Sequence, residues 1–513
     1  MNRLLQNLPE STRRILLTCS VMLAAIIQVL DTTIANVAMP HMQGSLSANQ
    51  DQIAWVLTSY IVAAAITMPM TGFIAGKFGR KRLMLWSVLG FTVASGLCGA
   101  AQTLTQMVLL RMLQGMFGAC LVPLSQSVLL DTFPVAKHAK AMAIWGVGVM
   151  VAPILGPTLG GWLTEYYSWR WVFYINLPFG ILAFVGISAL VVESPLDRER
   201  RFDVFGFFLF SISIGALQLM LDRGQSQYWF ESLEIVSLLV ICCLFMYLFV
   251  VHMFTCPRPF IEPALFRDRN FVLSLVFIFM VGIILLATLA LLPPYLQSLL
   301  GYPVLDAGLI LAPRGAGTML AMMFSSPLMA RFSARTIIML GLFCIAASLW
   351  YMTGFSLDTD GVAIGWTGFV QGLGLGLVFV PLSTVAFVTL NPVLRTEAAS
   401  IFSLVRNIGS SVGISIVVSQ LADNTQFYHE VIGESLTLFN QALSVPSVVQ
   451  VLNTQTQQGL ASLNGELTRQ AAQMAYIADF RLIMWMALAA IPLALLLRSP
   501  EAGAVAPVEA VID

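Results

Sequence analysis

The chain is poor in charge and in polar segments. Only 10% of its 513 residues are charged, against roughly 25% in soluble domains, while 58% are hydrophobic and the mean hydropathy is +0.85. A soluble globular protein is therefore excluded. Apolar runs of the roughly 20 residues that cross a bilayer recur along the sequence, and they are continuous, not alternating. This pattern predicts membrane-spanning helices and argues against barrel strands.

Three further absences narrow the function. No Walker A sequence occurs and no polar segment is large enough for a nucleotide-hydrolysing domain, which argues against an ATP-driven pump. The 4 histidines are scattered without metal-ligand or triad spacing, so neither a metal site nor an enzyme is predicted, and no cofactor is expected. The 7 cysteines lie in or beside apolar runs without ligand-like spacing, and we expect reduced packing residues.

Polar breaks divide the chain into fourteen predicted membrane spans. Lys and Arg concentrate at the N-terminus and in the even-to-odd connections, so the positive-inside rule predicts that both termini are cytoplasmic. The predicted spans cover approximately residues 15–38, 52–73, 83–102, 105–130, 139–163, 171–192, 204–221, 232–254, 270–293, 305–329, 335–354, 362–389, 397–420 and 477–498.

An internal repeat groups these spans into two halves. "QGMFGACLVPLSQSVLL" from Gln114 resembles "QGLGLGLVFVPLSTVAFV" from Gln371, and "TGFIAGKFGRK" from Thr71 loosely resembles "SSPLMARFSAR" from Ser325. Many secondary transporters consist of two such repeats with the binding site between them. The predicted units are a six-helix bundle over 1–193, a linker with two inserted helices over 194–265, a second six-helix bundle over 266–500 and a cytoplasmic tail over 501–513.

Four stretches resemble signatures of a known family. They are "LDTTIANVAMP" (30–40) in the first helix, "RMLQG" (111–115) in the fourth, "APILGPTLGG" (152–161) in the fifth and "SWRWVFYINLPFG" (168–180) before the sixth. Over nearly its whole length the chain resembles the fourteen-helix drug/proton antiporters of the major facilitator superfamily, and EmrB-type multidrug efflux pumps most. The resemblance implies an all-α fold of 14 transmembrane helices in a bacterial inner membrane, proton coupling, and partnership with an EmrA-like periplasmic adaptor and an outer-membrane channel.

An aspartate inside the first predicted span is the main candidate for proton coupling. A charge at mid-helix costs about 2.5–3.5 kcal/mol on insertion scales, so Asp31 calls for a function and a partner. Gln28, Thr32 and Asn36 share its helical face, which is predicted to line a cavity. Counted from the ends of their spans, Asp31 and Arg111 both lie roughly 10 Å below the outer surface, so Arg111 is the predicted counter-charge. A purely structural ion pair is the alternative.

The predicted chemistry is a protonation cycle. Water access and the distance to a neighbouring arginine both change the proton affinity of a carboxylate. A conformational change that alters either one at Asp31 therefore converts into proton uptake or release.

Further candidates come from position or from the resemblance. Cavity candidates are Trp55, Tyr60, Trp145, Arg314 and Arg406, although either arginine could instead bond a backbone carbonyl. Antiporter-helix candidates are Pro153, Gly156, Pro157, Gly160 and Gly161, whose small residues allow close helix packing. The resemblance places a cytoplasmic gating loop at Gly72, Gly79, Arg80 and Lys81. Gly76 and Lys77 stand where the family usually has an acid and an arginine, so we expect the family's latch to be lost or to use another residue.

The preferred interpretation is a proton-coupled antiporter that exports hydrophobic drugs or amphiphilic compounds by alternating access between its halves. Two alternatives stay open: an exporter or symporter of a specific metabolite such as a fatty acid, siderophore or amino acid, and a sensor that binds a ligand without moving it. Residues 421–476 form the one long polar segment and are predicted to be an external loop that contacts the adaptor. A flexible loop without a partner is the alternative there.

Overall fold

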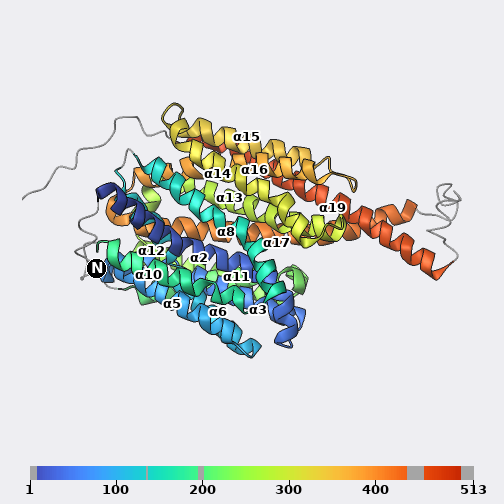
Figure 1. Ribbon diagram of the computed structural model, residues 1–513, viewed down its shortest axis with the longest axis horizontal. Helices are drawn as coiled ribbons and strands as arrows, with labels where there is room; N and C mark the ends of the chain where they lie inside the picture. The colour runs from blue at the N-terminus through green and yellow to red at the C-terminus, as the bar shows by residue number, and fades with distance from the viewer. Residues whose placement is uncertain (1–8, 135–136, 194–201, 436–455, 498–513) are drawn as a thin grey trace, which may run out of the picture.

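A computed structural model shows an elongated, all-helical bundle (Figure 1). It describes residues 9–134, 137–193, 202–435 and 456–497. Within these ranges 13 helices are long and apolar enough to cross a membrane, and one bent pair brings the number to 14. This agrees with the predicted all-α class and the fourteen predicted spans.

The helices fall into three groups along the chain. The first group contains α2 (Glu10–Ser45), α3 (Gln50–Thr67), α4 (Met70–Phe78), α5 (Arg80–Ala100), α6 (Leu104–Gly118), α7 (Leu121–Thr132), α8 (His138–Tyr166), α9 (Trp171–Tyr174) and α10 (Asn176–Leu190). The inserted pair is α11 (Val204–Arg223) and α12 (Leu233–Thr255). The last group contains α13 (Arg269–Pro294), η5 (Tyr295–Leu299), α14 (Val304–Met329), α15 (Ala334–Met352), α16 (Gly361–Val388), α17 (Arg395–Ser435) and α19 (Gln457–Leu493).

The second predicted span is bent. α3 and α4 meet at an angle of 56° across Met68 and Pro69. Proline has no backbone N–H to donate and its ring clashes with the preceding turn, so the helix breaks there. The apolar run over residues 52–73 had predicted a single uninterrupted span.

The segment predicted as a long external loop is instead largely helical. α17 continues to Ser435 and α19 begins at Gln457, so both helices extend well beyond the rest of the bundle (Figure 1). His429 Nε2 lies 3.0 Å from Asn464 Oδ1 and joins the two extensions. Residues 436–455 lie outside the described residues. The polar composition of 421–435 and 457–476 is that of helices outside the apolar bundle, which a search for apolar runs cannot distinguish from a loop.

The two ends of the bundle differ in how the halves meet. We call the end where α2 begins and α19 ends the terminal end, and the opposite end the distal end. At the terminal end α17 packs directly on α4 and α7. Nearer the distal end α11 lies between α3 and α17: Asp222 accepts a hydrogen bond from Thr58 of α3, and Gln218 Nε2 donates to Ser411 Oγ of α17 at 2.5 Å. The halves are therefore in direct contact at the terminal end, and towards the distal end α11 bridges α3 and α17 while α8 packs directly on α14.

Small residues set the distance between neighbouring helices. A Cβ atom on Gly115 of α6 would lie only 2.4 Å from the carbonyl oxygen of Tyr60 on α3. Gly161 on α8 has nothing within 4 Å of such an atom. Both glycines lie inside helices, so an alanine at either one gains the same helix propensity and differs only in the space it needs.

We therefore expect Gly115→Ala to destabilise the protein by about 1–3 kcal/mol, because overpacking forces α3 and α6 apart. Gly161→Ala is the matched control and is expected to leave stability unchanged or slightly raised. Thermal unfolding of the purified variants in one detergent measures the difference. Equal melting temperatures for the two variants would contradict the packing assigned to Gly115.

Candidate functional site

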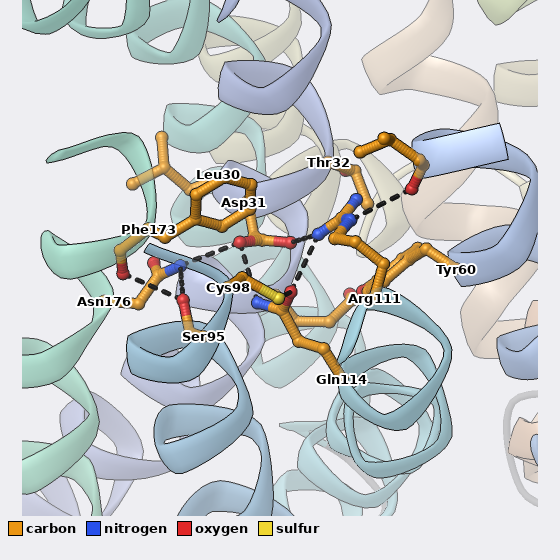
Figure 2. Close-up of polar contacts among 12 residues, drawn as sticks. Leu30, Asp31, Thr32, Tyr60, Ser95, Cys98, Arg111, Gln114, Phe173 and Asn176 are labelled. Atoms are coloured by element: carbon orange, nitrogen blue, oxygen red, sulfur yellow. Dashed lines mark hydrogen bonds and ion pairs between the residues drawn. The ribbon is translucent and has the colours of Figure 1, made fainter. Parts of the chain in front are cut away.

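A buried ion pair joins the first and fourth spans. Arg111 Nη1 of α6 lies 2.5 Å from Asp31 Oδ2 of α2, and both side chains have 0% exposure (Figure 2). Gln114, one turn after Arg111, donates from Nε2 to Asp31 Oδ1 at 2.9 Å and accepts from Arg111 Nη1 at 2.9 Å. The contact predicted from matching depths is therefore present, with an amide that locks both partners.

A third donor reaches the carboxylate from α10. Asn176 Nδ2 donates to Asp31 Oδ1 at 2.8 Å and to Ser95 Oγ of α5 at 3.0 Å, and Ser95 Oγ donates to the carbonyl of Phe173 at 2.8 Å (Figure 2). Asn176 is the first residue of α10, and Pro178 occupies the first turn, where its missing N–H costs nothing. The break before α10 thus aims an amide at Asp31.

Arginine 111 is held by more than its ion pair. Its Nε donates to the carbonyl of Val56 on α3 at 3.1 Å, and its guanidinium lies 4.3 Å from the ring centroid of Tyr60. Gln28 Nε2 in turn donates to the Tyr60 hydroxyl at 3.0 Å. Tyr60, predicted as a cavity aromatic, is instead buried as part of the arginine's surroundings. Low-dielectric surroundings strengthen each of these contacts and make a lost partner costly.

The polar face predicted for the first helix is divided in two. Asp31 turns into the protein, whereas Gln28 and Thr32 are half-buried and Asn36 is exposed. Exposure on this face thus rises towards the distal end. Trp55 of α3, another cavity candidate, is 36% exposed, with its ring centroid 5.7 Å from the Arg223 guanidinium.

The tryptophan predicted on α8 lies between the halves. Trp145 is buried, donates from Nε1 to Ser125 Oγ of α7 at 2.9 Å, and stacks on Phe379 of α16 with ring centroids 5.9 Å apart. A small apolar cavity of about 20 Å³ adjoins it, lined by Met150, Val281, Leu285, Thr318, Met322, Leu375 and Phe379. Trp145 therefore packs the interface in this conformation, and the cavity beside it is far smaller than the roughly 300–1,000 Å³ of a typical ligand pocket.

The two arginines of the second half differ from Arg111. Arg314 of α14 is buried and donates from Nη2 to the carbonyl oxygen of Leu285 at 3.1 Å. Such a bond to a backbone carbonyl was the alternative to a cavity role in the sequence. Its Nη1 has no hydrogen-bond partner among the described residues. Arg406 of α17 is half-exposed. Neither forms an ion pair within the described part of the chain.

The gating-loop residues meet the second half at the terminal end. Gly79 has φ +96°, a backbone conformation that favours glycine. A Cβ atom there would clash with the carboxylate of Glu193, whose Oε1 accepts a hydrogen bond from the backbone N–H of Lys81 at 3.0 Å. Arg80 pairs with Asp131 at the end of α7. Arg395 of α17 pairs with the other oxygen of Asp131 at 3.2 Å.

Two further contacts close this end. Ser127 Oγ lies 2.9 Å from Thr396 Oγ1, and a Cβ on Gly72 would lie 2.7 Å from Glu397 Cβ. Lys77, at one of the degraded positions, lies with its ammonium 5.7 Å from the Phe73 ring centroid. Asp131 therefore supplies an acid that joins the two halves, although position 76 has none.

The glycines of the antiporter signature pack within the first half. A Cβ on Gly156 would lie 2.2 Å from Thr33 Oγ1, and one on Gly160 would lie 3.3 Å from Ile34, so both face α2. α8 meets the second half instead through the glycines of α14: a Cβ on Gly315 would touch Ile154 at 2.1 Å. Pro153 is half-buried within a continuous helix, and the side chain of Pro157 lies outside the described residues. Gly156 and Gly160 therefore allow close packing of α8 on α2 within the first half.

Gln114, Asn176 and Asp479 are buried polar residues that the sequence patterns did not single out. Both Gln114 and Asn176 lie inside the quoted family signatures. The signal available in the sequence was that Gln114 follows Arg111 by about one helical turn and that Asn176 stands two residues before Pro178. Asp479 of α19 has 0% exposure and was overlooked because it lies only three residues into the last predicted span. An acid that near a predicted boundary resembles an interfacial residue.

The number of helices long and apolar enough to cross a membrane defines a multi-pass membrane protein. The sequence profile of the Major Facilitator Superfamily matches residues 21–414. The multidrug export protein EmrB of Escherichia coli (strain K12) is 34% identical over 484 residues, covering 93% of this chain and 93% of that protein. The fatty acid resistance protein FarB of Neisseria gonorrhoeae is 36% identical over 431 residues, covering 83% and 84%. The chain belongs to the Major Facilitator Superfamily, and within it to the EmrB-, FarB- and EmrY-like export proteins, which are transporters and not enzymes.

Solved structures share the fold. The human organic anion transporter MFSD10 aligns with a TM-score of 0.57 over 92% of this chain and 99% of that chain, at 12% identity. The proton:xylose symporter XylE aligns with a TM-score of 0.59 over 94% and 97%, also at 12% identity. Identities this low establish the all-helical fold alone.

The buried pair predicts strong coupling between its two residues. Asp31→Asn or Arg111→Gln alone leaves one uncompensated buried charge, and we expect each to destabilise the protein by about 3–5 kcal/mol. The double variant removes both charges and is expected to cost much less than the sum of the singles. Unfolding free energies in mixed micelles measure this double-mutant cycle. Additive costs would show that the two side chains do not depend on each other.

Proposed function

We propose that this protein is a proton-coupled antiporter that exports lipophilic or amphiphilic compounds by alternating access, with Asp31 as the proton-binding group. The observation that carries the proposal is the fully buried carboxylate of Asp31, held by Arg111, Gln114 and Asn176 inside a bundle whose halves touch at the terminal end. An intramembrane acid with a dedicated arginine is costly, and such groups mark ion pathways.

The hydrogen-bond pattern defines the starting state. Both oxygens of Asp31 act only as acceptors, which is the arrangement of an ionised carboxylate. A proton that arrives from the distal side, where the polar face of α2 is exposed, neutralises the carboxylate and removes the charge that holds Arg111. α6 and α7 form one span from Leu104 to Thr132, so a shift at Arg111 reaches Asp131 and loosens its bond to Arg395.

The opened terminal end then completes the exchange. Substrate enters between the halves, and restoration of the Asp31–Arg111 bond expels the proton on the same side. A ligand that binds the open form shifts the equilibrium only by its differential affinity for the two forms, so substrate and proton are coupled through Asp31. The terminal end is the cytoplasmic side in this cycle, with both termini inside and the protein in a bacterial inner membrane.

Two similar proteins bear on the substrate class. EmrB is named a multidrug export protein and FarB a fatty acid resistance protein. Hydrophobic drugs and fatty-acid-like amphiphiles are therefore the proposed substrates of this chain. Arg314 and Arg406, which lack ion pairs among the described residues, favour uncharged or anionic ligands over cations, and so they keep export of a specific fatty acid as the second candidate.

Proton release tests the exchange. The lipophilic and uncharged dye Nile red, added to purified protein that has first been protonated by equilibration in weakly buffered acidic solution, is expected to release protons that a pH indicator records. Asp31→Asn should release fewer, whereas Asp358→Asn, at an exposed acid outside the bundle, should behave as wild type. Dye binding without any proton release from the wild type would remove the antiport proposal and leave a ligand-binding protein of another kind.

The extended helices offer a docking surface for a periplasmic adaptor. Phe427 is 32 residues beyond the start of α17, which is about 48 Å along a helix and more than the roughly 30 Å core of a bilayer. Phe427 and Val431 are 57% and 48% exposed and lie four residues apart on one face, and Leu460 of α19 is 50% exposed. Exposed apolar side chains outside the membrane are typical of a protein contact, and we assign them to an EmrA-like adaptor that continues to an outer-membrane channel.

Substitution of that apolar face tests the assignment. Phe427→Ser with Val431→Ser is expected to reduce capture of a purified EmrA-type adaptor at least tenfold. The matched control, Asp423→Ser with Glu430→Ser, changes exposed polar positions of the same helix and should capture normally. Nile red binding should be unaffected in both. Undiminished capture by the Phe427 and Val431 variant would exclude this face as the contact.

A further inference from the structure

The second half contains a buried acid that the exchange described above does not use. Asp479 of α19 has 0% exposure, and neither of its carboxyl oxygens has a hydrogen-bond partner among the described residues. Burial of an ionised carboxylate without a partner costs far more than burial of a neutral carboxylic acid. In this conformation Asp479 is therefore the protonated acid, in contrast to the fully bonded carboxylate of Asp31.

The internal repeat relates Asp479 to the Asp31 network. Asp31 and Thr288 are 257 residues apart, as are Gln114 and Gln371, and Gln371 Nε2 donates to Thr288 Oγ1 at 3.3 Å just as Gln114 donates to Asp31. The same offset places Gly368 at the position of Arg111. The second half therefore keeps the amide and lacks both charges of the pair.

The acid of the second half stands on its last helix. Asn176 precedes the final residue of α10 by 14 positions, and Asp479 precedes the final residue of α19 by 14 positions. The two helices are the last of their halves. Asp479 thus lies as far from the end of the last helix of its half as Asn176 does in the first half, and each half contains a buried acid within its spans.

The titratable side chains close to Asp479 are two tyrosines, Tyr476 on α19 and Tyr295 on η5, whose ring centroids lie 5.1 Å apart. Arg406 lies on the adjacent helix α17 and forms no hydrogen bond with Asp479. Arg406 is about 16 Å along α17 from its first residue and Asp479 about 21 Å from the end of α19, so both lie at similar depth from the terminal end. Arg481 on α19 is exposed and faces away.

We propose that Asp479 is a second proton-binding carboxyl of the transport cycle, carried by the second half and ionised when the halves move and water reaches it. The proposal rests on the proton antiport proposed above. Its consequence is the stoichiometry: one cycle exchanges two protons, one from each half, and an uncharged substrate is then driven by both.

Proton counting tests the second site. With saturating Nile red, Asp479→Asn is expected to release half as many protons per molecule as wild type, and the double variant with Asp31→Asn none. Asparagine has nearly the shape of the protonated acid, so the melting temperature of Asp479→Asn should stay close to that of wild type. Equal release from wild type and a folded Asp479→Asn variant would reduce Asp479 to a packing residue and overturn the proposal.

An infrared measurement on the wild type keeps this test independent of antiport. The C=O stretching band of a protonated carboxyl group, identified by its loss in Asp479→Asn, should be present in the ligand-free protein and should weaken when Nile red is added. A band that Nile red leaves unchanged overturns the second site. If no protons are released by the wild type although the band weakens, Asp479 still exchanges its proton internally and it is the antiport proposal that fails.

Discussion

The ion pair between Asp31 and Arg111 is the interaction on which the rest of the first half depends. Its bonds reach α2, α6, α3 and α10 through Asp31, Arg111, Val56 and Asn176, so four helices meet at one buried point. Neither charge is tolerable there alone. The arrangement of these helices is therefore tied to the charge state of one carboxyl group, which is what a proton-driven transporter requires of its structure.

In the proposed cycle, the contacts between the halves convert the charge state of Asp31 into access from one side of the membrane. At the terminal end Asp131 bonds Arg80 of its own half and Arg395 of the other, and Ser127 meets Thr396. The two ion pairs of Asp131 are partly exposed and individually weak, whereas the Ser127–Thr396 contact is buried. In the proposed cycle the buried pair sets the preference between closed and open forms, and these terminal contacts carry it across the interface. The inserted helix α11 bridges α3 and α17 towards the distal end, while α8 and α14 keep the two halves in direct contact beside it.

Much of this could be predicted from residues with one dominant physical constraint. Fourteen apolar runs predicted fourteen spans, and the cost of a charge in a membrane pointed to Asp31 and, through depth, to Arg111. A search for apolar runs was insufficient in two places. It overlooked the bend that Pro69 makes in the second span, and it could not show that the polar residues 421–435 and 457–476 continue two helices. The packing of Gly156 and Gly160 on α2 depends on which face α8 turns to the other half, which helical spacing leaves open. The roles of the site residues in proton coupling, substrate binding and gating, and the division of the chain into two bundles with an inserted pair, remain predictions.

A reversible disulfide at the terminal end tests most directly whether closure of that end is linked to the ionised state of Asp31. Ser127→Cys with Thr396→Cys places two thiols where hydroxyl oxygens are 2.9 Å apart, close enough to form a disulfide between the halves. Proton release on addition of Nile red is then measured before and after reduction. We expect no proton release from the oxidised protein and full proton release once the disulfide is reduced. Equal release in both states would contradict the link between the closed terminal end and the ionised Asp31.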